Sequence, residues 1–199
     1  SSVCAALMNN AKEIIPTDSS EKAVSLFNSL DKERRFLAGE RNGVKIQGFN
    51  AGNSPLDFVE ETISGKTIIL TTTNGTKLFL TAKDSYKKVV GSFVNFSNVL
   101  EDIHSAINSK EIKQIVFLCA GLNGRLSLED TLCARGFIYE LLNTKDFELT
   151  DTALTAKLLY EFHKDDLSNF IRKTEHARHL LDLDLERDVE ICLTKEKYP

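Results

Sequence analysis

Short apolar runs alternate along the chain with segments whose apolar residues recur at helical spacing. The runs are rich in Ile and Val and are bounded by turn residues, a pattern typical of buried strands. They predict strands at residues 13–16, 35–39, 67–72, 88–93 and 114–120. Strand, turn and helix in repeated succession predict an α/β fold, layered α/β/α, with a mostly parallel sheet covered on both faces.

Apolar residues three and four positions apart predict helices before, between and after these runs. In the first three quarters of the chain they cover residues 1–10, 19–30, 95–107 and 127–142. Beyond about residue 145 the sequence becomes helical throughout and rich in charge. We therefore expect an α/β core over residues 1–145 and a helical C-terminal portion over residues 146–199 that packs on it.

Composition narrows the class of protein. A net charge of -4, without a block of Lys or Arg, argues against a nucleic-acid partner. No apolar stretch is long enough to span a bilayer and none resembles a signal peptide, so we expect a cytoplasmic protein without a membrane partner. The four cysteines lack the paired spacing of a zinc site and are expected to be reduced thiols.

The first candidate site is the polar turn TTTNGT at residues 71–76, which follows the apolar run TIIL. Open α/β sheets bind ligands beyond the carboxyl ends of their strands. Gly75 permits close backbone approach, and Thr72, Thr73, Asn74 and Thr76 offer hydrogen bonds, so the turn is predicted to bind an anion such as phosphate. The alternative is a purely structural turn in which Asn74 caps the next helix.

The second candidate is the stretch CAGLNGRLSLED at residues 119–130. Cys119 and Arg125 have the C-x5-R spacing of protein tyrosine phosphatases, in which loop amides wrap the phosphate and the thiolate attacks phosphorus. Gly121 and Gly124 lie between them, and a predicted strand and helix flank the loop. However, Leu126 occupies the place where that family carries a hydroxyl residue. The alternative is that Cys119 is a small apolar residue at the end of a strand.

Two acidic residues follow this loop. Glu129 and Asp130 suffice for a magnesium site, because Mg²⁺ needs only one or two protein carboxylates beside water and phosphate. Ser127 and Asp130 also have the S-x-x-D spacing of a helix cap, so both explanations stay open. His176 and His179 lie three apart on a predicted helix, where they would either face a metal together or serve packing.

The long segment at residues 39–55 is rich in glycine, and loops of this length are often functional. Arg41 follows a strand and would either clamp a phosphate or sulfonate or remain a solvated charge. Asn53 and Ser54 precede a helix, and Ser54, Pro55 and Asp57 have the spacing of a helix cap.

Taken together, these segments resemble the 2-phosphosulfolactate phosphatases of coenzyme M biosynthesis. The resembling pieces, in the family's order, are NNAKEIIPTDSSEKA, AGERNGVKIQGFNAGNSPLDF, GKTIILTTTNGT, VVGSFVNFSNV and FLCAGLNGRLSLEDTLCARG. They cover most of residues 1–140, whereas the tail matches loosely. The matching polar positions are Glu40, Arg41, Asn53, Ser54, Thr72, Thr73, Asn74, Thr76, Asn95, Arg125, Glu129 and Asp130.

The resemblance implies a Mg²⁺-dependent phosphatase that converts (R)-2-phospho-3-sulfolactate to 3-sulfolactate and phosphate. Asp130, with Glu129, would hold the metal. Arg125 and the amides of residues 74–76 and 121–124 would stabilise the phosphoryl charge. Arg41 and the turn at residues 53–54 would hold the carboxylate or sulfonate.

The family's first strand ends in Asp-Val-(Leu/Phe)-Arg-Ala, and the resemblance implies that this strand precedes residue 1 and that a final strand follows residue 199. An acidic residue at the end of that first strand is a natural metal ligand or nucleophile. Two alternatives remain: a metal-independent phosphatase that uses Cys119, and a non-catalytic protein that binds an anionic metabolite. A homodimer is compatible with the sequence, from which no interface can be read.

Overall fold

The computed structural model describes residues 1–82, 85–109 and 112–198. The chain divides into two compact units, Ser1–Tyr86 together with Tyr198, and Lys87–Lys197. Residue 145, where the sequence predicts the change from an α/β core to a helical portion, lies inside the second unit, between two helices that pack on each other. The predicted domain boundary stays a prediction. Within the described ranges, no helix is both long and apolar enough to cross a membrane.

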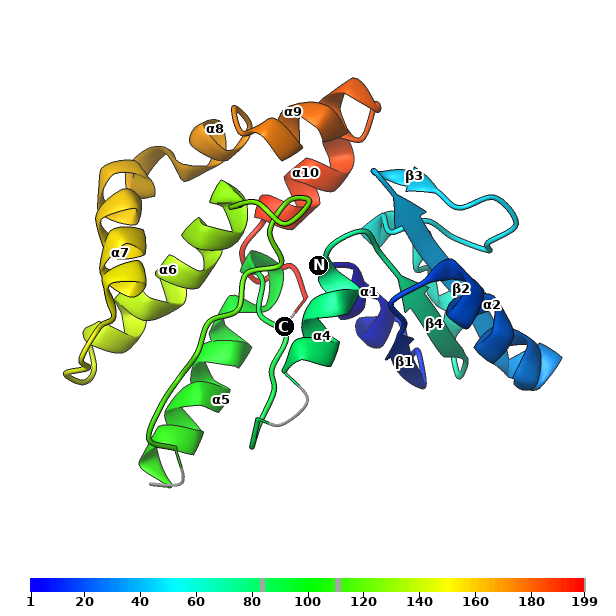
Figure 1. Ribbon diagram of the computed structural model, residues 1–199, viewed down its shortest axis with the longest axis horizontal. Coiled ribbons are helices and arrows are strands. Elements are labelled where there is room, and N and C mark those ends of the chain that lie inside the picture. The colour runs from blue at the N-terminus through cyan, green and yellow to red at the C-terminus, as the bar shows by residue number, and fades with distance from the viewer. Residues whose placement is uncertain (83–84, 110–111, 199) are drawn as a thin grey trace. The chain divides into compact units, whose positions relative to one another are not determined.

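The first unit holds a four-stranded sheet in the order β1-β4-β2-β3 (Figure 1). Its strands are β1 (Glu13–Pro16), β2 (Arg35–Arg41), β3 (Val44–Lys45) and β4 (Thr67–Thr71). Its α-helices are α1 (Ser2–Met8), α2 (Ser20–Ser29), α3 (Glu60–Ile63) and α4 (Gly75–Thr81), and its 3₁₀-helices are η1 (Lys32–Arg34) and η2 (Pro55–Asp57). β4 pairs in parallel with both β1 and β2, whereas β3 is antiparallel to β2. The mostly parallel sheet is therefore confirmed.

Both faces of this sheet are buried, which explains why its central strand reads as a continuous apolar run. On one face, Ile68 and Leu70 of β4 pack with Phe36 of β2 and with Ala5 of α1. On the other face, Ile69 packs with Ala23 of α2 in a second cluster. Residues alternate between the faces because successive strand side chains point in opposite directions. The layered arrangement brings the carboxyl ends of β2 and β4 to one edge of the sheet.

All the named elements that the structure describes in the second unit are helices, joined by irregular segments. It contains η3 (Phe93–Asn95), α5 (Phe96–Asn108), α6 (Leu128–Leu142), α7 (Asp151–His163), η4 (Lys164–Asp166), α8 (Leu167–Ile171), α9 (Glu175–Asp182) and α10 (Glu186–Leu193). One core cluster joins Phe93, Leu132 of α6, Tyr160 of α7 and Ile171 of α8. The predicted helical C-terminal part is thus confirmed.

The strands predicted at residues 88–93 and 114–120 are wrong, because neither segment forms a hydrogen-bonded ladder with another described segment. The second segment keeps the alternation of a strand, with Val116 and Leu118 exposed and Phe117 half-buried. Phe117 stacks on Phe137 of α6, with ring centroids 6.1 Å apart. Side-chain packing on a helix, and not a neighbouring strand, therefore holds this segment.

One charged side chain lies wholly inside the second unit. Arg135 of α6 is 0% exposed, and its nearest carboxylate oxygen, on Glu161 of α7, is 3.6 Å from Nη2. Its three guanidinium nitrogens make no hydrogen bond within the described part of the chain, and its guanidinium carbon lies 5.7 Å from the centroid of the Tyr139 ring. Burial lowers the pKa of Arg135. This arrangement is costly, since buried donors without acceptors forfeit their hydration.

Candidate functional site

The residues predicted to form the site fall into two groups, one in each unit. The first unit carries Arg41, Asn53, Ser54, Thr72, Thr73, Asn74, Gly75 and Thr76, and the second carries Gly121, Gly124, Arg125, Glu129 and Asp130. Each group is organised by contacts within its own unit.

Glu40 organises the polar loops at the edge of the sheet in the first unit. Its buried carboxylate accepts hydrogen bonds from Thr73 through N–H (2.7 Å) and Oγ1 (3.0 Å), and from the Gly43 N–H (2.8 Å). These bonds join the turn after β4 to the turn between β2 and β3. The structure thus brings the end of β2 and the predicted anion-binding turn together, as their place at one sheet edge requires.

Arg41 points toward the same turn and is held by neutral acceptors. Its Nη2 donates to Thr71 Oγ1 (3.0 Å) and to Ser20 Oγ (3.2 Å), and its Nη1 donates to the Glu40 carbonyl (2.7 Å). Hydroxyl and carbonyl partners leave the cation's charge without an opposing carboxylate at these contacts. Arg41 is thus held in place by the protein, and its role as a clamp for an anion stays a prediction.

The turn at residues 72–76 satisfies much of its own hydrogen bonding. The Thr72 and Thr76 N–H groups each donate to the other's Oγ1 at 3.2 Å, and Thr76 Oγ1 donates to the Thr72 carbonyl. Asn74 occupies the N-cap position of α4 but makes no side-chain capping bond. An anion at this turn would therefore compete with Thr72 for the Thr76 amide, while Gly75 begins the helix.

The predicted helix cap at residues 54–57 is confirmed. Ser54 Oγ accepts from the Leu56 N–H at 3.1 Å, and Pro55 is the first residue of η2. The Asn53 carbonyl accepts from Ser2 Oγ of α1. Substrate binding by Asn53 and Ser54 stays a prediction.

In the second unit, the loop after Cys119 is a tight reverse turn. Leu122 and Arg125 exchange two backbone hydrogen bonds of 2.9 Å. Asn123 and Gly124 between them both have positive φ, 52° and 77°, which defines a type I′ turn. A side chain at Gly121 would lie 2.6 Å from the Arg125 carbonyl oxygen. The loop is therefore not open to wrap a phosphate with its amides, as the C-x5-R interpretation requires.

Cys119 lacks the electrostatics of a nucleophile. Although the residue reaches solvent, desolvation by its surroundings and then the charge of Asp130 raise the pKa of its thiol to about 11. At pH 7 such a thiol is thiolate about once in 10⁴ molecules, whereas catalytic cysteines are largely ionised. The metal-independent alternative is therefore disfavoured.

Replacing the sulfur tests this conclusion. Cys119→Ser is expected to retain at least about half of the wild-type kcat, because a neutral side chain of similar size replaces a neutral thiol. Steady-state phosphate release measures it. A loss of a thousandfold or more would restore Cys119 as the nucleophile.

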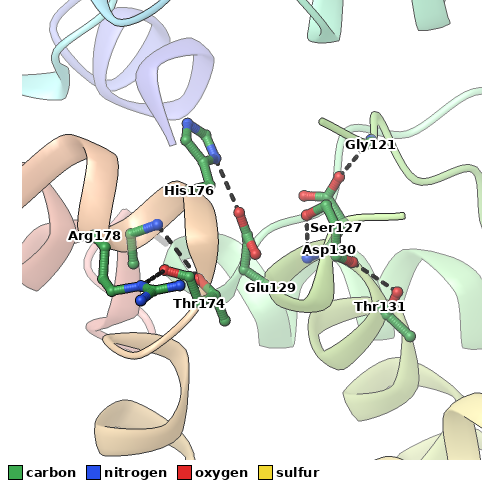
Figure 2. Close-up of polar contacts among 9 residues, drawn as sticks. Gly121, Ser127, Glu129, Asp130, Thr131, Thr174, His176 and Arg178 are labelled. Atoms are coloured by element: carbon green, nitrogen blue, oxygen red, sulfur yellow. Dashed lines mark hydrogen bonds and ion pairs between the residues drawn. The ribbon is translucent and has the colours of Figure 1, made fainter. Parts of the chain in front are cut away.

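The acidic pair lies at the N-terminus of α6, where Figure 2 shows both carboxylates held from outside the helix. The predicted cap is confirmed, since Ser127 Oγ accepts from the Asp130 N–H at 3.2 Å. Asp130 Oδ2 accepts from the Gly121 N–H at 2.8 Å, and Glu129 Oε1 lies 2.9 Å from His176 Nδ1. The loop glycine thus positions Asp130.

The two neighbouring carboxyl groups have pKa values shifted in opposite directions. Burial raises the pKa of Asp130, an effect that the Gly121 hydrogen bond offsets only in part. Burial also acts to raise the pKa of Glu129, but hydrogen bonds from His176 and from its own N–H outweigh it, so the net shift is downward. Adjacent carboxyl groups in such unequal environments are typical of functional sites.

Helix α9 contributes contacts that the sequence did not reveal. Glu175 Oε1 accepts from Arg125 Nη2 at 2.6 Å, and the next residue, His176, contacts Glu129. Both partners lie about fifty residues away in sequence, so no local spacing could have indicated them. The N-terminal turn of α9 therefore contacts two of the predicted site residues.

The acidic pair fits Mg²⁺ better than a transition metal. The described residues contain no group of three or more His, Cys, Asp or Glu side chains that could hold a metal ion. Zinc sites need three or four protein ligands, whereas Mg²⁺ is held by one or two carboxylates, with water and substrate phosphate completing the shell. The desolvated carboxylate of Asp130 would also gain from a nearby cation, which favours its ionised form.

Comparison with known proteins gives one consistent result. A family model described as 2-phosphosulpholactate phosphatase matches residues 1–199. A probable 2-phosphosulfolactate phosphatase of Caldanaerobacter subterraneus is 39% identical over 98% of this chain and 79% of its own length. Proteins of the same name from Clostridium perfringens and Thermotoga maritima are each 39% identical, over 97% and 100% of this chain and 76% and 81% of their own lengths.

Proposed function

Because the chain belongs to the 2-phosphosulfolactate phosphatase family, we propose that it hydrolyses the phosphate ester of a small 2-phosphohydroxy acid. We take (R)-2-phospho-3-sulfolactate as the substrate and 3-sulfolactate and phosphate as the products, a step of coenzyme M biosynthesis. The observation that carries this proposal is the family match over all 199 residues. The Arg125 guanidinium and the carboxylates of Glu129 and Asp130 would supply the charges that phosphoryl transfer needs.

The second unit would carry the reacting phosphate. Asp130 and Glu129 would hold Mg²⁺, which when bound neutralises charge on the phosphoryl oxygens and orients the attacking water. The Arg125 guanidinium would bind phosphoryl oxygens and stabilise the charge that develops on them. The Gly121 N–H is engaged by Asp130, so its role is to position that carboxylate, while the positive φ of Gly124 shapes the turn that presents Arg125.

The polar loops of the first unit would bind an anion. Arg41, held beside the end of β4 by Thr71 and Ser20, would bind a carboxylate or sulfonate together with the turn at residues 53–54. The Thr72 hydroxyl, whose oxygen accepts from the Thr76 N–H, and the amides of Asn74 and Gly75 would donate to a further anionic oxygen. The hydroxyls of Thr73 and Thr76 would shape the turn instead, because they donate to Glu40 and to the Thr72 carbonyl. Glu40 would not touch the substrate, because its oxygens accept from Thr73 and Gly43.

Metal removal tests the proposed reaction. We expect the full-length protein to release phosphate from 2-phospho-3-sulfolactate with Mg²⁺, to lose at least about 90% of that activity in excess EDTA, and to regain it when Mg²⁺ is restored. Colorimetric phosphate detection measures each state. Activity unaffected by EDTA contradicts the metal's role, and saturable substrate binding without release in any condition supports a non-catalytic binding protein.

Neutralising Glu175 tests the role of Arg125. An exposed ion pair contributes about 0–1 kcal/mol, so freeing Arg125 is expected to lower KM by up to about fivefold with little change in kcat. Glu175→Gln with initial-rate kinetics measures this change, and Glu186→Gln, which alters another exposed pair, is the matched control. A higher KM in Glu175→Gln would show that the pair orients Arg125 productively.

A further inference from the structure

The carboxylate of Glu129 is held by a side chain from a different helix. Glu129 lies in the first turn of α6, and His176 lies in the first turn of α9. The contact joins Oε1 to Nδ1 at 2.9 Å, with the two side chains 21% and 35% exposed. This partial burial limits screening by water, so the contact constrains Glu129 more than an exposed pair would.

The direction of this hydrogen bond follows from the charge of Glu129. A carboxylate that binds a metal ion is ionised, and its oxygens can only accept a hydrogen bond. His176 must therefore carry a hydrogen on Nδ1 and donate it. Such a bond fixes the rotamer of Glu129 and determines where its second oxygen points.

His176 is itself presented by an anchored helix end. Thr174 Oγ1 caps α9 by accepting from the Ala177 N–H at 3.3 Å, and the Thr174 carbonyl accepts from Arg178 Nε at 3.4 Å (Figure 2). Thr174 and Ala177 are both 5% exposed. The backbone that carries His176 is thus fixed by burial and capping, so the imidazole is positioned in advance.

We propose that His176 is a positioning residue that orients Glu129 as a metal-binding carboxylate, which makes α9 part of the catalytic unit. The inference rests on the proposed function and deepens it. The two carboxylates are then held in equivalent ways, Asp130 by the Gly121 amide and Glu129 by the His176 imidazole. Carboxylates that bind metals are commonly oriented by such hydrogen bonds, whose loss weakens metal affinity about 10- to 100-fold.

The test compares three variants of the full-length protein with Mn²⁺ as the probe metal. His176→Ala removes the donor, His176→Asn keeps an N–H close to the position of Nδ1, and His179→Ala is the matched control on the same helix. Mn²⁺ affinity, measured by electron paramagnetic resonance, is expected to fall about tenfold in His176→Ala, to recover largely in His176→Asn and to be unchanged in His179→Ala. Turnover should follow the same order at low Mg²⁺, and His176→Ala should approach the wild-type kcat at saturating Mg²⁺.

Three results would overturn the inference: equal Mn²⁺ affinity in wild type and His176→Ala, equal losses in the Ala and Asn variants, or no Mn²⁺ binding by the wild type. Thermal unfolding of each variant separates a folding defect from a lost contact. If the wild type binds Mn²⁺ but releases no phosphate, the proposed function fails, while the Mn²⁺ comparison still decides the role of His176.

Discussion

Asp130→Asn is expected to lower phosphate release by at least about a hundredfold at saturating Mg²⁺. Asn cannot supply the negative charge that holds the cation, and electrostatic contacts to the reacting group are typically each worth a hundred- to a thousandfold in rate. That loss corresponds to at least about 2.7 kcal/mol of transition-state stabilisation. Initial rates across a series of Mg²⁺ concentrations measure it. If raising the Mg²⁺ concentration returned the rate of Asp130→Asn to that of the wild type, Asp130 would contribute to metal affinity alone.

The fold should survive this substitution. The carbonyl of Asn can still accept from the Gly121 N–H, which Asp130 engages at 2.8 Å. The raised pKa of Asp130 means that the folded state holds its proton more tightly than the unfolded state does. Ionised Asp130 therefore costs stability once the pH exceeds its unfolded pKa, so removing the charge should leave Tm unchanged or higher at pH 7. Asp151→Asn, in the first turn of α7, is the matched control with unchanged rates.

The sheet of the first unit could be predicted because its strands are buried on two faces. Ile68, Ile69 and Leu70 of β4 each have a neighbouring layer, so burial and periodicity agree along the strand. Residues 114–120 have a similar apolar composition, and there the prediction of a strand was wrong. Periodicity reports which face of a segment is buried, and here Phe117 finds that burial against α6 without any ladder. Strand pairing requires a second strand beside the segment, and the sequence of the segment itself does not show whether one is present.

In the candidate site too, the features set by local sequence could be predicted, and those that depend on distant contacts could not. The cap from Ser127 to Asp130 was predictable, since it joins residues three apart. The C-x5-R spacing misled because Asn123 and Gly124 favour a type I′ turn that engages the loop's own amides. The contact from His176 to Glu129 joins α9 to α6 across 47 positions of sequence. Helical periodicity indicates which face of a helix is exposed, but it does not identify the partner of a side chain on that face.

Arg135 shows how the same packing can work against stability. Its guanidinium is fully buried within the second unit, yet its nearest carboxylate oxygen is 3.6 Å away, beyond hydrogen-bond distance. The partner, Glu161, is 40% exposed and would be solvated if it were left alone. The desolvation penalty of a buried charge without hydrogen bonds exceeds the attraction within such a distant pair, because desolvation can exceed the Coulombic gain even in well-formed buried pairs.

Arg135→Met is therefore expected to stabilise the protein. Met has a similar unbranched stem and fills irregular core space, so packing beside Tyr139 is retained while the buried charge is removed. We expect a gain of about 1–3 kcal/mol in the free energy of unfolding, measured by urea denaturation at pH 7. Arg172→Met, which removes an arginine paired with both Glu186 and Glu190, is the control and should be neutral or slightly destabilising. A destabilisation of Arg135→Met would mean that the guanidinium's interaction with Tyr139 and Glu161 outweighs its lost hydration, because Met preserves the apolar contacts and leaves only the charge to account for the difference.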